Sequence, residues 1–291
     1  MTIISAIIKR DFIIVASDSL IVEDNKRKFP KNPKFVAFPK LRCIVSYWGR
    51  VSIKKGGKTN ADWEIGKWLH EKLNHQDNFT SIEEFGVLLT KELTCIFQNP
   101  QYSWPEYKML GIHLLGFECF ENKWIPELFL IIGDSNGWNF NFSRRTYGDL
   151  KNWENMETDI ILQRETVYNV LEKGYTVYNN GDNEMFNHFY NSFHEAIKST
   201  ANRAMLLDGF SKEFFHDLAT FPIKQVAYFQ KKYYGKENIS VGGKVHSILM
   251  NSNGTIEKKN FLKINFFPPL PQGFSLVGNM TGRQRAISNV A

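Results

Sequence analysis

Thr2 is the residue of this sequence whose position most directly allows chemistry, because removal of Met1 would leave its hydroxyl beside a free α-amine. A hydroxyl is a weak nucleophile and needs a base close to it. An α-amine with a pKa of about 7.7–8.0 can accept its proton near neutral pH. While Met1 is attached, the nitrogen of Thr2 is an amide without useful basicity. The predicted nucleophile therefore depends on the removal of Met1.

Two charged residues follow Thr2 at equal intervals. Asp18 lies 16 residues after Thr2, and Lys34 lies 16 residues after Asp18. An ammonium group near the amine favours the deprotonated amine and a developing alkoxide, and a carboxylate can orient that ammonium. A glycine such as Gly49 can bring its backbone N–H close to an oxyanion, because it has no Cβ. Taken singly, an Asp after a strand and a Lys in a basic loop are ordinary surface features.

Other local patterns do not complete a known site. Residues 56–59 (GGKT) are similar to the end of a phosphate-binding loop, but that motif requires glycine where this chain has Ser52. His70 and His75 lie five residues apart, which separates them by about 140° on a helix and prevents shared metal binding. The remaining histidines, His113 among them, show no ligand spacing and are predicted to be structural or exposed. We expect no metal and no cofactor.

The composition is that of an ordinary globular protein. The chain has 291 residues, of which 43% are hydrophobic and 14% aromatic, and its net charge is +6. The N-terminus lacks the charge order of a signal peptide, and no apolar run approaches the roughly 18 residues of a membrane span. Three cysteines form no C-x-x-C pair. We therefore expect a cytoplasmic protein, and we interpret its short basic clusters as a solvated surface rather than as a nucleic-acid site.

Apolar runs and periodicity predict strands, then two helices, then strands, two helices and a last strand. Ser81 and Glu84 form a capping box at the start of the second helix, and Pro222 is expected to break or restart the last helix. This order differs from strict β-α alternation and favours two stacked antiparallel sheets with a helix pair on each outer side. The expected strands and helices are, in chain order, 2–9, 12–17, 35–38, 42–48, 62–76, 81–97, 110–118, 126–133, 138–143, 175–180, 183–201, 211–234 and 242–254.

With these elements in order, the sequence resembles proteasome β subunits and their bacterial HslV-like relatives, threonine peptidases of the N-terminal-nucleophile hydrolase superfamily. Members open with a nucleophilic Thr, end the second strand with an Asp, and place a Lys before the third strand and a Gly after a later one. The matching residues are Thr2, Asp18 in IIVASDS, Lys34 in NPKFVAF and Gly49 in IVSYWGR. The segment 221–254 resembles the family's last long helix, Gly-Gly turn and closing strand.

The resemblance implies a four-layer αββα fold. One domain would span 2–256, with an insertion at 144–173 and a C-terminal extension at 257–291. The chain departs from active members near the Gly-Gly turn. Where they place an Asp and, three residues later, a Ser, it has Asn238 and Val241. Asp182 best matches the family's mid-chain Ser, and it could supply the missing carboxylate.

The function implied by the resemblance is a threonine-type amide hydrolase or peptidase. Thr2 would be its nucleophile, with Lys34, Asp18, Gly49, Asn238 and Asp182 as supporting residues. Its partners would be a peptide or protein substrate, further copies of the chain in a ring, and an ATP-dependent unfoldase. One alternative is a catalytically inactive proteasome-like subunit that acts in assembly or binding. A second is a basic nucleic-acid-associated protein that uses the same fold.

Overall fold

The computed structural model describes residues 3–23, 26–28, 33–49, 51–53, 63–99, 110–120, 122–133, 139–144, 175–180, 211–233, 239 and 241–260. All of these residues belong to the compact unit Met1–Phe261. Within them, helices combine with strands that pair antiparallel, which confirms the predicted α+β class. No helix of the described residues is both long and apolar enough to cross a membrane.

Sheet 1 is built on the first hairpin of the chain. β1 (Ile4–Lys9) and β2 (Phe12–Asp18) pair antiparallel around a turn at Arg10 and Asp11. Both strands are almost entirely buried, because they lie inside the sheet and carry apolar residues on both faces. The strand order of sheet 1 is β12 (Tyr175–Asn180), β1, β2, β13 (Val245–Asn251) and β14 (Ile256–Asn260).

Sheet 2 contains the middle strands of the chain. Its order is β11 (Phe140–Arg144), β10 (Lys123–Gly133), β9 (Leu110–Phe120), β6 (Cys43–Gly49) and β5 (Phe35–Phe38). The β9–β10 hairpin, formed by two of the predicted strands, lies inside this sheet. Two short pairs stand apart from both sheets. They are β3 (Ile21–Glu23) with β4 (Lys26–Lys28), and β7 (Ser52–Ile53) with β8 (Trp63–Glu64).

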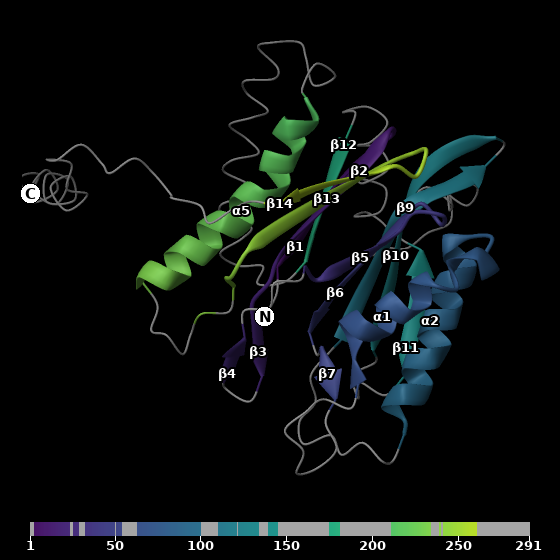
Figure 1. The fold of residues 1–291 in the computed structure, drawn as a ribbon, viewed down its shortest axis with the longest axis horizontal. Helices are drawn as coiled ribbons and strands as arrows, with labels where there is room; N and C mark the ends of the chain where they lie inside the picture. The colour runs from purple at the N-terminus through teal and green to yellow at the C-terminus, as the bar shows by residue number, and fades with distance from the viewer. Residues whose placement is uncertain are drawn as a thin grey trace, which may run out of the picture. The chain divides into compact units, whose positions relative to one another are not determined.

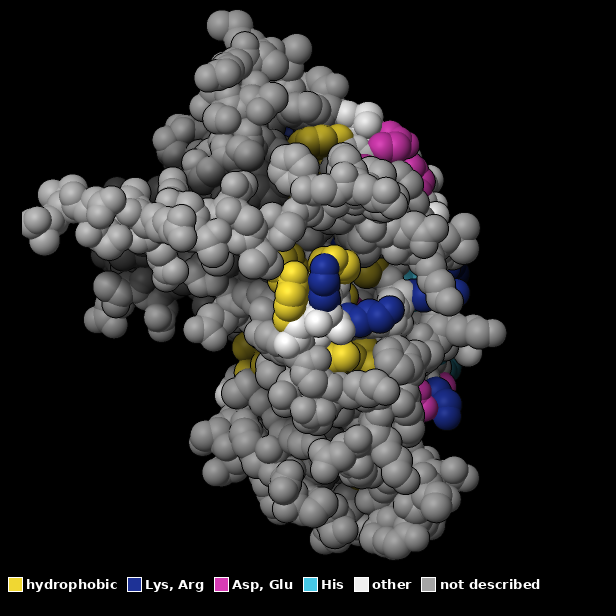
Figure 2. All heavy atoms as spheres, turned by 90° about the vertical axis from the view of Figure 1, so that its left-hand side faces the viewer, with side chains coloured by type: hydrophobic (Ala, Val, Ile, Leu, Met, Phe, Trp, Pro, Cys, Tyr) yellow, Lys and Arg dark blue, Asp and Glu magenta, His cyan; other side chains and the backbone are white. Residues whose placement is uncertain are grey.

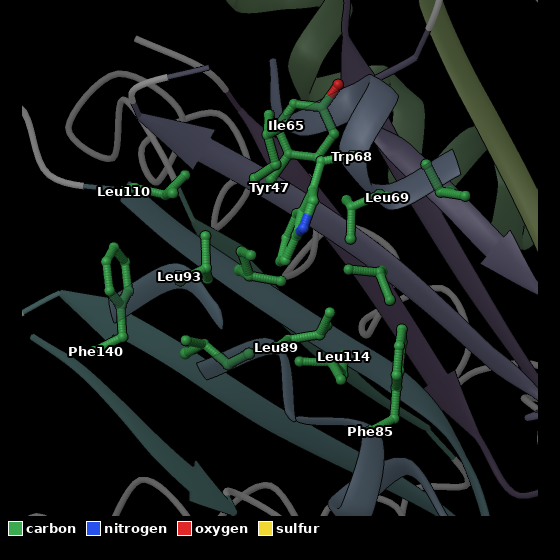
Figure 3. Packing of buried hydrophobic residues seen from close by; sticks show 14 of the residues in the cluster. Tyr47, Ile65, Trp68, Leu69, Phe85, Leu89, Leu93, Leu110, Leu114 and Phe140 are labelled. Atoms are coloured by element: carbon green, nitrogen blue, oxygen red, sulfur yellow. The ribbon is translucent and has the colours of Figure 1, made fainter. Parts of the chain in front are cut away.

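Two helices cover one face of sheet 2: α1 (Ile65–Leu73) and α2 (Ile82–Phe97), with the short 3-10 helix η1 (Gln76–Asn78) between them. Their apolar faces join side chains from β5, β6, β9, β10 and β11 in one buried cluster. Figure 3 shows Tyr47 of β6 directed into this cluster beside Ile65 and Trp68. The helical periodicity of the sequence therefore marks the correct buried faces.

At the start of α2, one of the two hydrogen bonds of the predicted capping box is present. The Ser81 hydroxyl accepts the backbone N–H of Glu84 at 3.0 Å, as expected. The return bond differs, because the Glu84 carboxylate accepts the backbone N–H and the hydroxyl of Thr80. These two donors also lower the pKa of Glu84.

Helix α5 (Lys212–Tyr233) covers the outer face of sheet 1 (Figure 1). Phe215, Leu218, Ile223 and Val226 pack against apolar side chains of β1, β2 and β13. The expected break at Pro222 is wrong, since α5 continues through it. Proline costs a helix interior roughly 3 kcal/mol. Burial of several apolar side chains on both sides of Pro222, at roughly 1.5–3 kcal/mol each, offsets that cost.

The two sheets face each other across a third apolar cluster. Ile4, Ala6 and Val15 of sheet 1 meet Leu115 and Phe117 of sheet 2 there. Side chains alternate between the faces of a strand, so each sheet buries both faces. The packing order is therefore α5, sheet 1, sheet 2, and then α1 with α2 (Figure 1).

Candidate functional site

Asp18 ends β2 as a fully buried carboxylate with donors on both oxygens. Its Oδ1 accepts the backbone N–H of Ile3 at 3.2 Å and the ammonium of Lys34 at 3.1 Å. Its Oδ2 accepts the backbone N–H groups of Leu20 at 3.2 Å and Gly242 at 3.3 Å. A buried charge is strongly unfavourable unless it is paired and hydrogen-bonded, and this environment meets both conditions.

Lys34 is the buried cation that pairs with Asp18, with only 1% of its surface exposed. Removal from water lowers the pKa of the Lys34 ammonium, and its attraction to Asp18 and their hydrogen bond offset only part of this effect. Its backbone is held from both sheets. The N–H donates to the hydroxyl of Ser17 on β2 at 3.3 Å, and the carbonyl accepts the N–H of Tyr47 on β6 at 3.1 Å.

The Gly-Gly turn closes the site from the C-terminal part of the chain. The Gly242 carbonyl accepts the N–H groups of Ser19 at 3.3 Å and Leu20 at 3.0 Å, while its own N–H donates to Asp18. Gly243 has a φ of 79°, a left-handed backbone that favours glycine. Gln230 of α5 accepts the N–H of Val241 at 2.9 Å, so the helix also holds this turn.

Gly49, the predicted oxyanion donor, is the last residue of β6 and is exposed. Its φ of 84° again requires the conformational freedom of glycine. It lies two residues after Tyr47, whose N–H bonds to the Lys34 carbonyl. Strand β6 therefore contains both Tyr47, which bonds to the backbone of Lys34, and Gly49, the predicted oxyanion donor.

Three of the predicted site residues, Thr2, Asp182 and Asn238, lie outside the described residues. The described ladder between β1 and β12 ends with Ile4 opposite Asn180. Thr2 is two residues before Ile4, and Asp182 is two residues after Asn180. The described ladder therefore stops two residues short of each candidate.

The structure brings together Asp18, Lys34 and the Gly242 turn. Sequence reasoning missed Ser17, Gln230 and the contact from Gly242 to Asp18. Gly242 and Asp18 lie 224 residues apart, and only the pairing of β2 with β13 brings them together. Val241, expected to leave the site without a polar group, has its side chain in the apolar cluster under α5.

Some basic side chains of the described part are held by partners within the fold. Lys72 bonds to Glu92 at 2.7 Å, and the Lys232 ammonium lies over the rings of Tyr228 and Tyr233. On the face drawn in Figure 2, Lys or Arg side chains stand beside apolar ones. Within the described ranges, no group of three or more His, Cys, Asp or Glu side chains is arranged to hold a metal ion.

The arrangement can hold a positive charge and a fixed carboxylate beside the start of β1, out of contact with water. Such a pair suits the stabilisation of a developing negative charge and the control of a nearby proton. Neither the models of known protein families nor the curated proteins give a significant match to this chain.

Proposed function

We propose that this chain is a proteasome-like amide hydrolase of the N-terminal-nucleophile type, with Thr2 as its nucleophile after Met1 is removed. The observation that carries the proposal is the buried Lys34–Asp18 pair at 3.1 Å, whose carboxylate also accepts the N–H of Ile3. That N–H belongs to the peptide group that joins Thr2 to Ile3. The pair is thus bonded directly to the chain beside the predicted nucleophile.

The packing order supports the same proposal. We assign α5, sheet 1, sheet 2 and the α1–α2 layer to the four-layer αββα sandwich of these hydrolases. In this assignment, β1 starts at the candidate site and β2 ends at it. The turn that precedes β13 reaches the site from the far end of the chain, through the bond from Gly242 to Asp18.

The proposed reaction is acyl transfer from an amide to the Thr2 hydroxyl, followed by hydrolysis. The Thr2 oxygen attacks the carbonyl carbon, and its proton passes to the α-amine of Thr2. The carbon–nitrogen bond then breaks, the leaving amine takes that proton, and an ester on Thr2 remains. Water attacks the ester with the α-amine again as the base, which releases the acid and restores Thr2.

The described residues have separate roles in this reaction. Lys34 keeps the local field positive, which favours the neutral amine and the negative charge that develops on oxygen. Asp18 fixes the position of Lys34 through a charge-assisted hydrogen bond. The N–H of Gly49 is the proposed donor to the oxyanion. Asp182 and Asn238 are proposed to support the amine.

A catalytically inactive subunit of the same fold is the second candidate. It is favoured by Val241, whose fully buried apolar side chain stands where active family members carry a Ser. In this case the Lys34–Asp18 pair would serve only to fix the start of β1. Such a subunit would act without catalysis, either in the assembly of a ring or in the binding of a partner.

Covalent labelling separates the two candidates. We expect a threonine-directed electrophile to modify the wild-type protein at Thr2 and to leave Thr2→Ala unmodified, as read by mass spectrometry. Thr255→Ala is the matched control, because Thr255 is exposed in the β13–β14 turn and should not affect labelling. Equal labelling of wild type and Thr2→Ala, or no labelling of either, would refute Thr2 as the nucleophile.

A further inference from the structure

A buried polar cluster between the two sheets is not used by the proposed reaction. At its centre is His113 of β9, which is fully buried. Its neighbours Ile112 and Leu114 face the helices, so the imidazole points toward sheet 1. Ser46 and Trp48 of β6 flank Tyr47 and face the same way, since Figure 3 shows Tyr47 among the helix-side residues. The cluster thus begins on two neighbouring strands of sheet 2, β9 and β6, and extends into the space between the sheets.

The hydrogen bonds define the protonation of His113. The Trp48 indole N–H donates to His113 Nε2 at 3.1 Å, and an indole nitrogen can only donate. Nε2 must therefore carry a lone pair, and the proton resides on Nδ1, where it meets the Ser46 hydroxyl at 3.3 Å. Burial also lowers the pKa of His113 to about 3, so the ring is a neutral acceptor at physiological pH.

The same nitrogen connects to the edge strand of sheet 1. The Tyr178 hydroxyl lies 3.2 Å and the Asn180 amide nitrogen 3.1 Å from His113 Nε2. Both residues belong to β12, which is an outermost strand of sheet 1 in the described order. Asn180 is paired with Ile4, next to the residue whose N–H bonds to Asp18.

The position of Trp48 is fixed by a second, independent feature. Its indole lies over Gly111 of β9, where an added Cβ would come within 2.3–2.5 Å of the ring. Glycine at position 111 is thus needed for the indole to reach His113. Trp48 directly precedes Gly49, the proposed oxyanion donor.

We propose that His113 is a positioning residue for the candidate site. As the acceptor of the Trp48 indole N–H within sheet 2, it fixes Trp48, and hence the end of β6 that carries Gly49. Nε2 has a single lone pair, so Tyr178 and Asn180 share it with Trp48, and this shared contact also holds β12 beside the start of β1. This proposal rests on the proposed function, because its consequence is the alignment of Gly49 with a substrate held at Thr2.

The first test follows the Trp48 indole N–H by NMR of the ¹⁵N-labelled protein, with the resonance identified by its loss in Trp48→Phe. The matched pair is His113→Gln, whose amide oxygen can reach the position of Nε2, and His113→Asn, which is too short. We expect hydrogen exchange of this N–H to accelerate about tenfold or more in His113→Asn and to stay near wild type in His113→Gln. Equal exchange in the two variants would overturn the acceptor role.

The second test measures how the rate of Thr2 labelling depends on electrophile concentration. We expect the maximal rate to fall about tenfold in His113→Asn and in Trp48→Phe, with the half-saturating concentration unchanged and the rate recovered in His113→Gln. Trp48→Phe keeps an aromatic ring above Gly111, so the test does not depend on the stability of His113→Asn. A normal maximal rate in both His113→Asn and Trp48→Phe would refute the positioning role of His113 but not the hydrolase function. Absence of labelling in the wild type would refute the hydrolase function itself.

Discussion

At the scale of single residues, the Asp18–Lys34 pair argues for function more than for stability. A buried ion pair loses most of its attraction to the cost of dehydration, and well-packed apolar residues often replace it without loss. This pair is instead kept inside the fold with three backbone N–H donors on the carboxylate. A fixed charge with a fixed orientation is what a proton-transfer site requires.

Replacing Lys34 with Met should abolish Thr2 labelling while leaving the fold intact. The three backbone donors still satisfy Asp18, so we expect a smaller loss of stability than in Asp18→Asn, which leaves the Lys34 ammonium without its carboxylate. Loss of one partner of a buried pair costs about 3–5 kcal/mol. Urea denaturation gives the stabilities and mass spectrometry gives the labelling. Wild-type labelling of Lys34→Met would contradict the assigned role.

His113 should make the protein less stable in acid. Its pKa is about 3 in the fold against an ordinary value of 6.5, so between these values the unfolded chain binds more protons than the folded one. This contribution is complete above pH 6.5 and is lost as the pH falls toward 3, by up to about 1.4 kcal/mol per pH unit. Urea denaturation at several pH values should show a shallower slope in His113→Gln than in wild type. Identical slopes would show that the ring does not stay neutral.

At the scale of elements, the local pattern was sufficient to predict most of what positions the site. Apolar runs located β1, β2, β6, β9 and β10, and helical spacing located α1 and α2, because burial of one or both faces determines these patterns. The local sequence could not predict that α5 continues through Pro222, because the packing of α5 on sheet 1 determines this. The predicted helix at 183–201 lies outside the described residues, and of the predicted insertion at 144–173 only Arg144, the last residue of β11, is described.

The candidate site was predictable only in part, for a related reason. Asp18 and Lys34 were predicted from the resemblance to a family with an ordered Thr, Asp and Lys, and the structure shows that the two side chains are in contact. The His113 cluster draws its members from β6, β9 and β12, and nothing in their sequence separation indicates that they meet. The bond from Gln230 to Val241 likewise exists only because α5 lies over the turn.

The connection between α5 and the Gly-Gly turn can be tested at Gln230. Gln230→Leu would leave the buried N–H of Val241 without this acceptor, and we expect a loss of about 1–3 kcal/mol in stability. Because the turn also donates to Asp18, labelling of Thr2 should slow as well. Lys231→Leu, at an exposed position next to Gln230 on α5, is the control. Unchanged stability and labelling in Gln230→Leu would show that the turn is held without α5.

At the scale of the whole molecule, the three apolar clusters form one continuous stack of layers around two sheets. The candidate site lies where the end of β2 and the turn before β13 come together, and β6 approaches it from sheet 2 through Tyr47 and Lys34. Assembly into a ring with an unfoldase partner remains a prediction from the resemblance. Sedimentation velocity of the purified protein would show whether it associates.

The central claim, that Thr2 is an N-terminal nucleophile, is tested most directly by the intact mass of the protein isolated from its natural source. We predict a mass lower than that of the printed sequence by one methionine residue, because only then does Thr2 carry the free amine that the reaction needs as its base. A mass that includes Met1 would contradict the claim, since Thr2 would then carry an amide nitrogen.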